Sequence, residues 1–150
     1  MKRMLSLVLL VCMLMGCASA SAAINPPAST FASDYFISYG TTLSDNGGHV
    51  MHILFSTAGM GMCDVLGVAT YRVEKLVTLD DGNTIWASVT EDLPGKTGTN
   101  VPSYSYAINF QGKAEETYRV KCTFICTKTF SDGTHGTETK SHTSRSIKIK

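Results

Sequence analysis

The four histidines are the first residues to consider as metal ligands or general bases, and their spacing argues against both roles. His49 and His52 are three residues apart, and on a strand this spacing sends the two side chains to opposite faces. His135 and His142 lie in polar sequence near the C-terminus, where nothing places a third ligand beside them. We therefore predict no zinc site and no other metal site.

The acidic and nucleophilic residues form no catalytic pattern either. Glu115 and Glu116 are adjacent, so their carboxylates diverge on an extended chain, whereas the acid pair of a glycosidase must converge across a cleft. The turn at Asp80–Asn83 lacks the alternating acidic residues and final glutamate of a helix-loop-helix calcium site. No serine lies in a Gly-x-Ser-x-Gly elbow. We expect a protein that is not an enzyme and that needs no cofactor.

Trp86 is the residue best suited to contact a ligand. It is the single tryptophan, and it follows the turn that holds Asp81 and Asn83. An aromatic ring flanked by hydrogen-bonding side chains is a common contact for carbohydrate or protein ligands. We predict Trp86, Asp81 and Asn83 as ligand contacts, whereas the tyrosines on alternating positions belong to the core.

The elements that must position these side chains are β-strands. From Asp34 to Lys150 apolar residues recur mainly at spacing two, and clusters of Gly, Asn, Asp and Pro separate the runs. No apolar repeat of three and four residues is sustained, so helices are not expected. The seven predicted runs are 35–43, 49–56, 68–78, 84–91, 103–110, 118–127 and a C-terminal run that ends at 150. We predict an all-β, seven-stranded antiparallel sandwich of the immunoglobulin or fibronectin type III kind, with a barrel as the alternative.

The sixth run carries the most regular alternation. Tyr118, Val120, Cys122, Phe124 and Cys126 should face one way, which indicates a central strand. The segment Gly112–Tyr118 before it is similar to the corner between the fifth and sixth strands of immunoglobulin-like folds, where a tyrosine hydroxyl bonds to upstream backbone. This similarity favours the sandwich.

The N-terminus has the three parts of a signal peptide. Lys2 and Arg3 are basic, Leu5–Met15 is apolar, and Ala18–Ala23 is a run of small residues that contains Ala20-x-Ala22. The apolar stretch is shorter than the roughly 20 residues that span a bilayer. We predict a cleaved signal at 1–23, an extended tether at 24–33 and one domain at 34–150. The alternative is a lipid anchor, because Leu14–Cys17 is similar to a lipoprotein box with Cys17 as the lipidated residue.

Three cysteines follow the predicted signal, and they cannot all pair within one chain. On one strand Cys122 and Cys126 would lie about 13 Å apart, beyond the roughly 7 Å that a disulfide tolerates between Cα atoms. Any bridge must therefore join Cys63 to Cys122 or to Cys126. Three buried thiols are the alternative.

Several short stretches together resemble an uncharacterised family of small secreted proteins from Gram-positive bacteria, a domain-of-unknown-function family. They are Ser33–Phe36, Gly47–Val50 with Ile53–Phe55, Gly61–Met62 with Leu66–Gly67, Gly82–Trp86, and Tyr118–Phe124. The resemblance spans nearly the whole predicted mature chain. It implies export and a β-sandwich, and it implies no activity, cofactor or catalytic residue.

Charge limits the partners that the domain can have. The net charge is +1 and 17% of residues are charged, so the chain lacks the positive field that nucleic acid binding requires. We expect a secreted, monomeric, non-catalytic domain without a membrane span that binds an extracellular protein or glycan. The alternatives are a lipid-anchored envelope protein and a secreted enzyme or inhibitor whose site is built from scattered residues.

Overall fold

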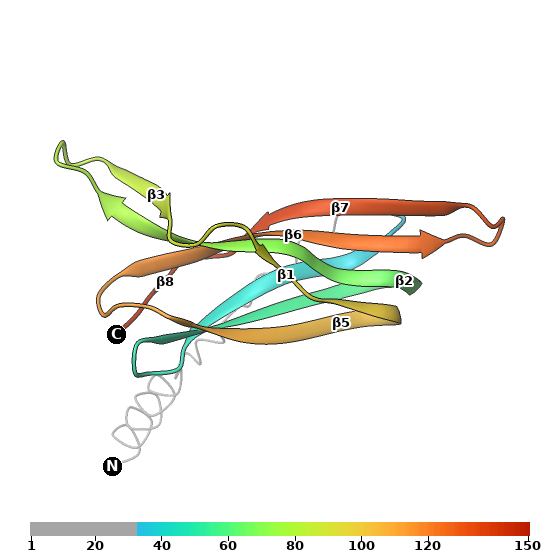
Figure 1. The fold of residues 1–150 in the computed structure, drawn as a ribbon, viewed down its shortest axis with the longest axis horizontal. Helices are drawn as coiled ribbons and strands as arrows, with labels where there is room; N and C mark the ends of the chain where they lie inside the picture. The colour runs from blue at the N-terminus through green and yellow to red at the C-terminus, as the bar shows by residue number, and fades with distance from the viewer. Residues whose placement is uncertain (1–32) are drawn as a thin grey trace, which may run out of the picture.

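The computed structural model describes residues 33–150, and these residues form an all-β domain (Figure 1). Strands account for 72% of them, and none lies in a helix. The prediction of an all-β fold from apolar residues at spacing two is therefore confirmed. The predicted signal peptide, Cys17 and all but the last residue of the predicted tether lie outside the described residues. Within 33–150, no helix is long and apolar enough to cross a membrane.

Eight strands form the domain. Their bounds are β1 (Phe36–Asp45), β2 (Val50–Thr78), β3 (Thr84–Ser88), β4 (Leu93–Pro94), β5 (Thr97–Gln111), β6 (Thr117–Thr129), β7 (His135–Thr143) and β8 (Ile147–Lys148). All of them pair within one antiparallel sheet, whose main path runs β1-β2-β6-β7. Strands β3, β4 and β5 also pair with β2, and β8 pairs with β6.

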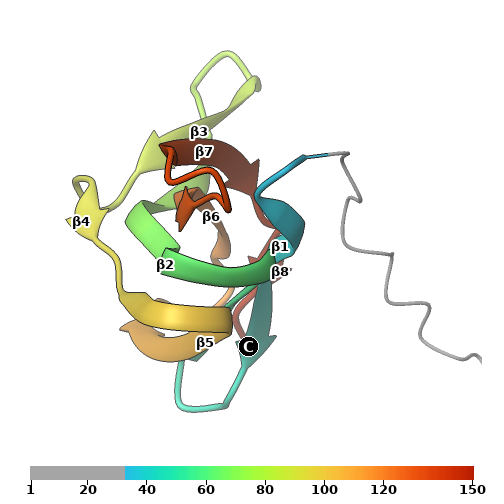
Figure 2. The same cartoon turned by 90° about the vertical axis from the view of Figure 1, so that its right-hand side faces the viewer.

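Strand β2 is 29 residues long and belongs to both layers of the domain. Its first part lies between β1 and β5, so that Phe55 is opposite both Thr41 and Tyr106. Its second part pairs with β6, where Val73 is opposite Val120. Between the two parts the register to β5 shifts, over Ala58 to Cys63. Seen along the long axis, the sheet curls around a common interior, with β5 on one side and β3 and β7 on the other (Figure 2).

The predicted sandwich of seven strands in two separate sheets is not confirmed by this arrangement. The runs predicted at 49–56 and 68–78 are parts of one strand, because the glycine-rich segment Gly59–Cys63 bends the chain and continues as strand. Gly61 has a φ of 83°, a backbone conformation that glycine adopts without strain. The two-residue strand β4 was not predicted, and the C-terminal run predicted to end at 150 is divided into β7 and β8.

The core lies between the two layers. Inward-facing residues of the first part of β2 meet inward-facing residues of β6, and Phe55 and Phe124 are at most 1% exposed. The alternation predicted for 118–126 is confirmed, because every second residue of β6 from Tyr118 to Cys126 is buried. Burying a phenylalanine side chain stabilises a fold by about 1.5–3 kcal/mol. This packing therefore holds the second part of β2 in place against β6.

The corner before β6 is closed by a tyrosine. The backbone N–H of Lys113 donates to the Tyr118 hydroxyl at 3.1 Å, and this hydroxyl donates to Glu116 Oε2 at 2.5 Å. The hydrogen bond to upstream backbone that the sequence predicts at this corner is thus present. It ties the chain that enters β6 to the end of β5.

Candidate functional site

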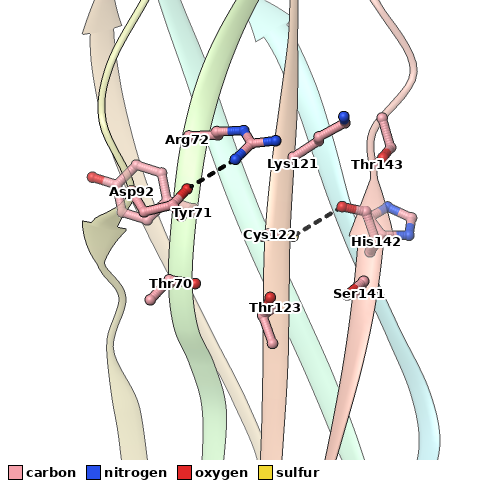
Figure 3. A pocket seen from close by; sticks show the side chains of 10 residues that line it. All are labelled: Thr70, Tyr71, Arg72, Asp92, Lys121, Cys122, Thr123, Ser141, His142 and Thr143. Atoms are coloured by element: carbon pink, nitrogen blue, oxygen red, sulfur yellow. Dashed lines mark hydrogen bonds and ion pairs between the residues drawn. The ribbon is translucent and has the colours of Figure 1, made fainter. Parts of the chain in front are cut away.

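An open pocket of about 340 Å³ lies on the sheet where β2, β6 and β7 run side by side (Figure 3). Strand residues form most of it, and Asp92, which directly precedes β4, approaches it from the side of β2. The lining residues are Thr70, Tyr71, Arg72, Asp92, Lys121, Cys122, Thr123, Ser141, His142 and Thr143. This is the candidate site.

Register arranges the polar side chains of the pocket in two rows that cross three strands. The first row is Arg72, Lys121 and Thr143, and the second row is Thr70, Thr123 and Ser141. Between the rows lies a third set of paired residues, Tyr71, Cys122 and His142, whose side chains belong to the opposite face because successive residues of a strand alternate. Neighbouring strands are about 4.8 Å apart, so each row is about 10 Å long.

The four hydroxyl side chains of the rows, which belong to Thr70, Thr123, Ser141 and Thr143, make no hydrogen bond to protein atoms within residues 33–150. Elsewhere on β6 and β7, the hydroxyls of Thr127 and Thr137 bond to each other at 2.9 Å. The hydroxyls in the pocket therefore keep their donor and acceptor capacity for a ligand.

A buried carboxylate holds the basic side chains next to the first row. Glu74 is 3% exposed although it lies two residues after Arg72 on the same face of β2. Its Oε2 accepts from Arg119 Nε at 2.7 Å, and its Oε1 lies 3.2 Å from Arg72 Nε and 3.3 Å from Lys121 Nζ. We call Glu74, Arg72, Arg119 and Lys121 the charge cluster.

The charge cluster keeps Glu74 ionised. Burial alone raises the pKa of Glu74, but hydrogen bonds from Arg119, Lys121 and Arg72 together with the charge of Arg119 outweigh it, and the pKa is lowered. A carboxylate in this state is a poor proton donor at neutral pH. Its role is to orient three cations, two of which line the pocket.

The two cations that line the pocket remain partly accessible. The side chains of Arg72 and Lys121 are 36% and 39% exposed, and Arg72 Nη1 lies 3.4 Å from the exposed Asp92 carboxylate. Three cations thus face the two carboxylates of Glu74 and Asp92, which leaves one positive charge uncompensated. Such a surface favours an anionic group on a ligand.

The predicted ligand contacts lie outside this pocket. Asp81 and Asn83 are at the tip of the hairpin between β2 and β3, where Asn83 donates from its backbone and side-chain nitrogens to Asp81, each at 2.9 Å. Trp86 on β3 is half-buried, and the Arg119 guanidinium lies 4.2 Å from its ring centre. The structure therefore brings Trp86 to the edge of the charge cluster, and it leaves Asp81 and Asn83 engaged with each other.

The histidines take separate positions. His49 Nδ1 lies 3.1 Å from the Lys150 carbonyl oxygen, and His52 Nδ1 lies 3.0 Å from Asn109 Oδ1. The His142 ring packs edge-on against Tyr39, with 6.2 Å between ring centres, and burial lowers its pKa. In the part of the chain that the structure describes, no three His, Cys, Asp or Glu side chains are grouped as metal ligands would be.

The three cysteines of the domain are buried thiols. The sulfur atoms of Cys63 and Cys126 are 3.1 Å apart. Cys122 instead lies 3.3 Å from the Thr41 hydroxyl, and burial raises its pKa to about 11. Of the two pairings that the sequence allows, the structure brings together Cys63 and Cys126.

Sequence reasoning did not find the pocket. The signals that it could have used are the hydroxyl residues at every second position of β7, at 137, 139, 141 and 143, and the basic residues Arg119 and Lys121 at alternate positions of β6. These signals become a site only when β2, β6 and β7 pair in the observed register. The pairing of β2 with β6 joins segments far apart in the sequence, so a short window of sequence does not predict it.

The chemistry of the pocket has to be inferred from its own geometry. Comparison of the chain with protein-family models, with curated proteins and with solved structures finds no match.

Proposed function

We propose that this domain is a non-catalytic binding module that acts outside the cell and holds a carboxylate-bearing glycan in the pocket between β2, β6 and β7. The observation that carries the proposal is the pair of polar rows, in which four unengaged hydroxyls adjoin Arg72 and Lys121. A uronic acid residue offers the matching groups, namely one carboxylate and several hydroxyls on one ring.

The balance of polar and apolar groups supports a sugar over an apolar peptide anchor. Pockets for apolar ligands are lined mainly by hydrophobic and aromatic side chains. Here the rows present only hydroxyls and charges, because the residues between them turn toward the core. The guanidinium of Arg72 and the ammonium of Lys121 form stronger hydrogen bonds to a carboxylate than to a neutral hydroxyl. We therefore expect acidic glycans to bind more tightly than neutral ones.

The architecture and export of the protein belong to the same proposal. The two parts of β2 and the Tyr118 corner support a fold related to the immunoglobulin-type sandwich, in which the long β2 connects the two layers. The N-terminal sequence supports cleavage of a signal peptide and release of the domain. Mass spectrometry of the mature N-terminus tests this part: a free Ala23 or Ile24 supports release, and a diacylated Cys17 shows a lipid anchor instead.

Binding is tested by isothermal titration with polygalacturonate and with dextran as the neutral control. We expect polygalacturonate to bind, with an affinity that falls as salt screens the charges. The matched variants are Thr143→Val in the first row and Thr139→Val, four residues earlier on the same face of β7 and outside the pocket. Loss of one hydrogen bond, about 0.5–1.5 kcal/mol, weakens binding roughly 2- to 12-fold, so Thr143→Val should show this loss and Thr139→Val should not.

Three results would contradict the proposal. Equal binding of both polysaccharides, or an equal loss of affinity in both threonine variants, would show that the pocket does not recognise the acidic glycan. Release of new reducing ends from polygalacturonate, abolished by Lys121→Met, would show an enzyme in place of a binding module.

A further inference from the structure

The domain has a second feature that the binding pocket does not use, namely the contact between the two buried thiols of Cys63 and Cys126. Cys63 lies where β2 bends, and Cys126 lies on β6, 63 residues later. The two sulfur atoms are 3.1 Å apart, and both residues are at most 1% exposed. A disulfide bond is about 2.05 Å long, so a shift of about 1 Å separates this contact from a bond.

We propose that Cys63 and Cys126 form a disulfide bond when the protein folds in the presence of a disulfide donor, and that Cys122 stays a thiol. The backbone is shaped for the Cys63 sulfur, because a side chain at Gly59 would collide with it. The third thiol is engaged elsewhere: Cys122 lies 3.3 Å from the Thr41 hydroxyl and 3.8 Å from the His142 carbonyl oxygen.

The reaction is thiol–disulfide exchange with a small disulfide such as oxidised glutathione. The thiolate of one cysteine attacks a sulfur of the donor, which forms a mixed disulfide and releases one glutathione thiolate. The thiolate of the second cysteine then attacks the protein sulfur of the mixed disulfide and releases the second glutathione. Two electrons pass from the protein to the donor, and the two thiol protons end on the two glutathione molecules.

The bridge must form before the core closes. In the folded domain both sulfurs are shielded from solvent, and burial raises the pKa of Cys126 to about 12, so little thiolate is present. In the unfolded chain both thiols are accessible. The consequence is that reductant acts slowly on the native protein and rapidly on the unfolded protein.

The experiment uses the full chain with Cys12→Ser and Cys17→Ser, so that only the three domain cysteines remain. The protein is unfolded with reductant, refolded in a mixture of reduced and oxidised glutathione, alkylated with N-ethylmaleimide and digested without reduction. Chymotrypsin cleaves after Phe124 and so separates Cys122 from Cys126. We expect one linked pair of peptides that contains Cys63 and Cys126, and an alkylated Cys122.

Cysteine variants identify the two residues that form the bridge. Cys122→Ser should keep the bridge, and Cys126→Ser should lose it. In the Cys122→Ser protein, unfolding with reductant should lower Tm by about 10 °C or more, because the bridge closes a long loop in the unfolded chain. Three alkylated cysteines after refolding, or a bridge that contains Cys122, would overturn the proposal. The result is independent of the pocket, so failure here leaves glycan binding intact.

Discussion

Replacing Glu74 by glutamine keeps the size of the side chain and removes the negative charge that three cations share. Glu74 is 3% exposed, and its carboxylate oxygens lie 2.7 to 3.3 Å from nitrogens of Arg72, Arg119 and Lys121. In the variant the three cations face one another with only the exposed Asp92 near Arg72. We therefore expect Glu74→Gln to be destabilised by mutual repulsion and by lost charge-assisted hydrogen bonds.

The expected loss is about 2 kcal/mol. Removing one member of a fully buried ion pair costs about 3–5 kcal/mol. Here the side chains of Arg119 and Lys121 are 22% and 39% exposed, so water compensates part of their charge and the cost is lower. For a domain of this size, about 2 kcal/mol corresponds to a decrease of roughly 8 °C in Tm.

The assay is urea unfolding at pH 7 followed by far-ultraviolet circular dichroism. The control is Glu115→Gln, since Glu115 pairs with Lys148 at 2.5 Å while its side chain is 74% exposed. Exposed pairs contribute little, so this control should change stability by less than about 0.5 kcal/mol. Added salt should restore part of the loss in Glu74→Gln, because it screens the repulsion between the cations. Equal stability of the two variants would refute the reasoning that the charge cluster stabilises the domain.

Acidification provides a second test of the charge cluster. The pKa of Glu74 is lowered in the folded state, so its contribution is present above its ordinary value of 4.5 and is lost as pH falls through the folded value. The wild type should therefore lose more stability than Glu74→Gln between pH 5 and pH 3. Parallel curves for the two proteins would contradict the assigned shift.

Two further predictions concern the core beneath the pocket. Phe124→Ala should lower the free energy of unfolding by about 3–5 kcal/mol in urea titrations, because Phe124 is 0% exposed and its loss leaves a cavity; a change below 1 kcal/mol would contradict its place in the core. Burial lowers the pKa of His142, so the folded state binds fewer protons than the unfolded state and stability should fall as pH drops below about 6.5. His142→Phe should flatten the pH dependence of stability between pH 7 and pH 5. An unchanged slope would show that other groups cause this dependence.

The amino-acid sequence determined the local features of this protein. Alternation along 118–126 fixed which side chains of β6 are buried, because successive residues of a strand must point to opposite faces. The Asp80–Asn83 turn signal placed the hairpin between β2 and β3, and the segment before Tyr118 placed the corner hydrogen bond. These features depend on residues close together in the chain, so their physical causes can be found in short windows of sequence.

Tertiary structure alone decided how β2 and the site are built. The glycine-rich segment at 59–63 predicted an interruption, yet pairing with β1, β5 and β6 on either side keeps β2 continuous. Glu74 would be an ordinary exposed residue of a strand, and it is buried because Arg119 and Lys121 of β6 cover it. The pairing of β2 with β6 that builds one side of the pocket and the Cys63–Cys126 contact arise in the same way, between segments that are far apart in the sequence. Such register depends on which faces of two distant strands are buried against each other, so it cannot be read from one short window of sequence.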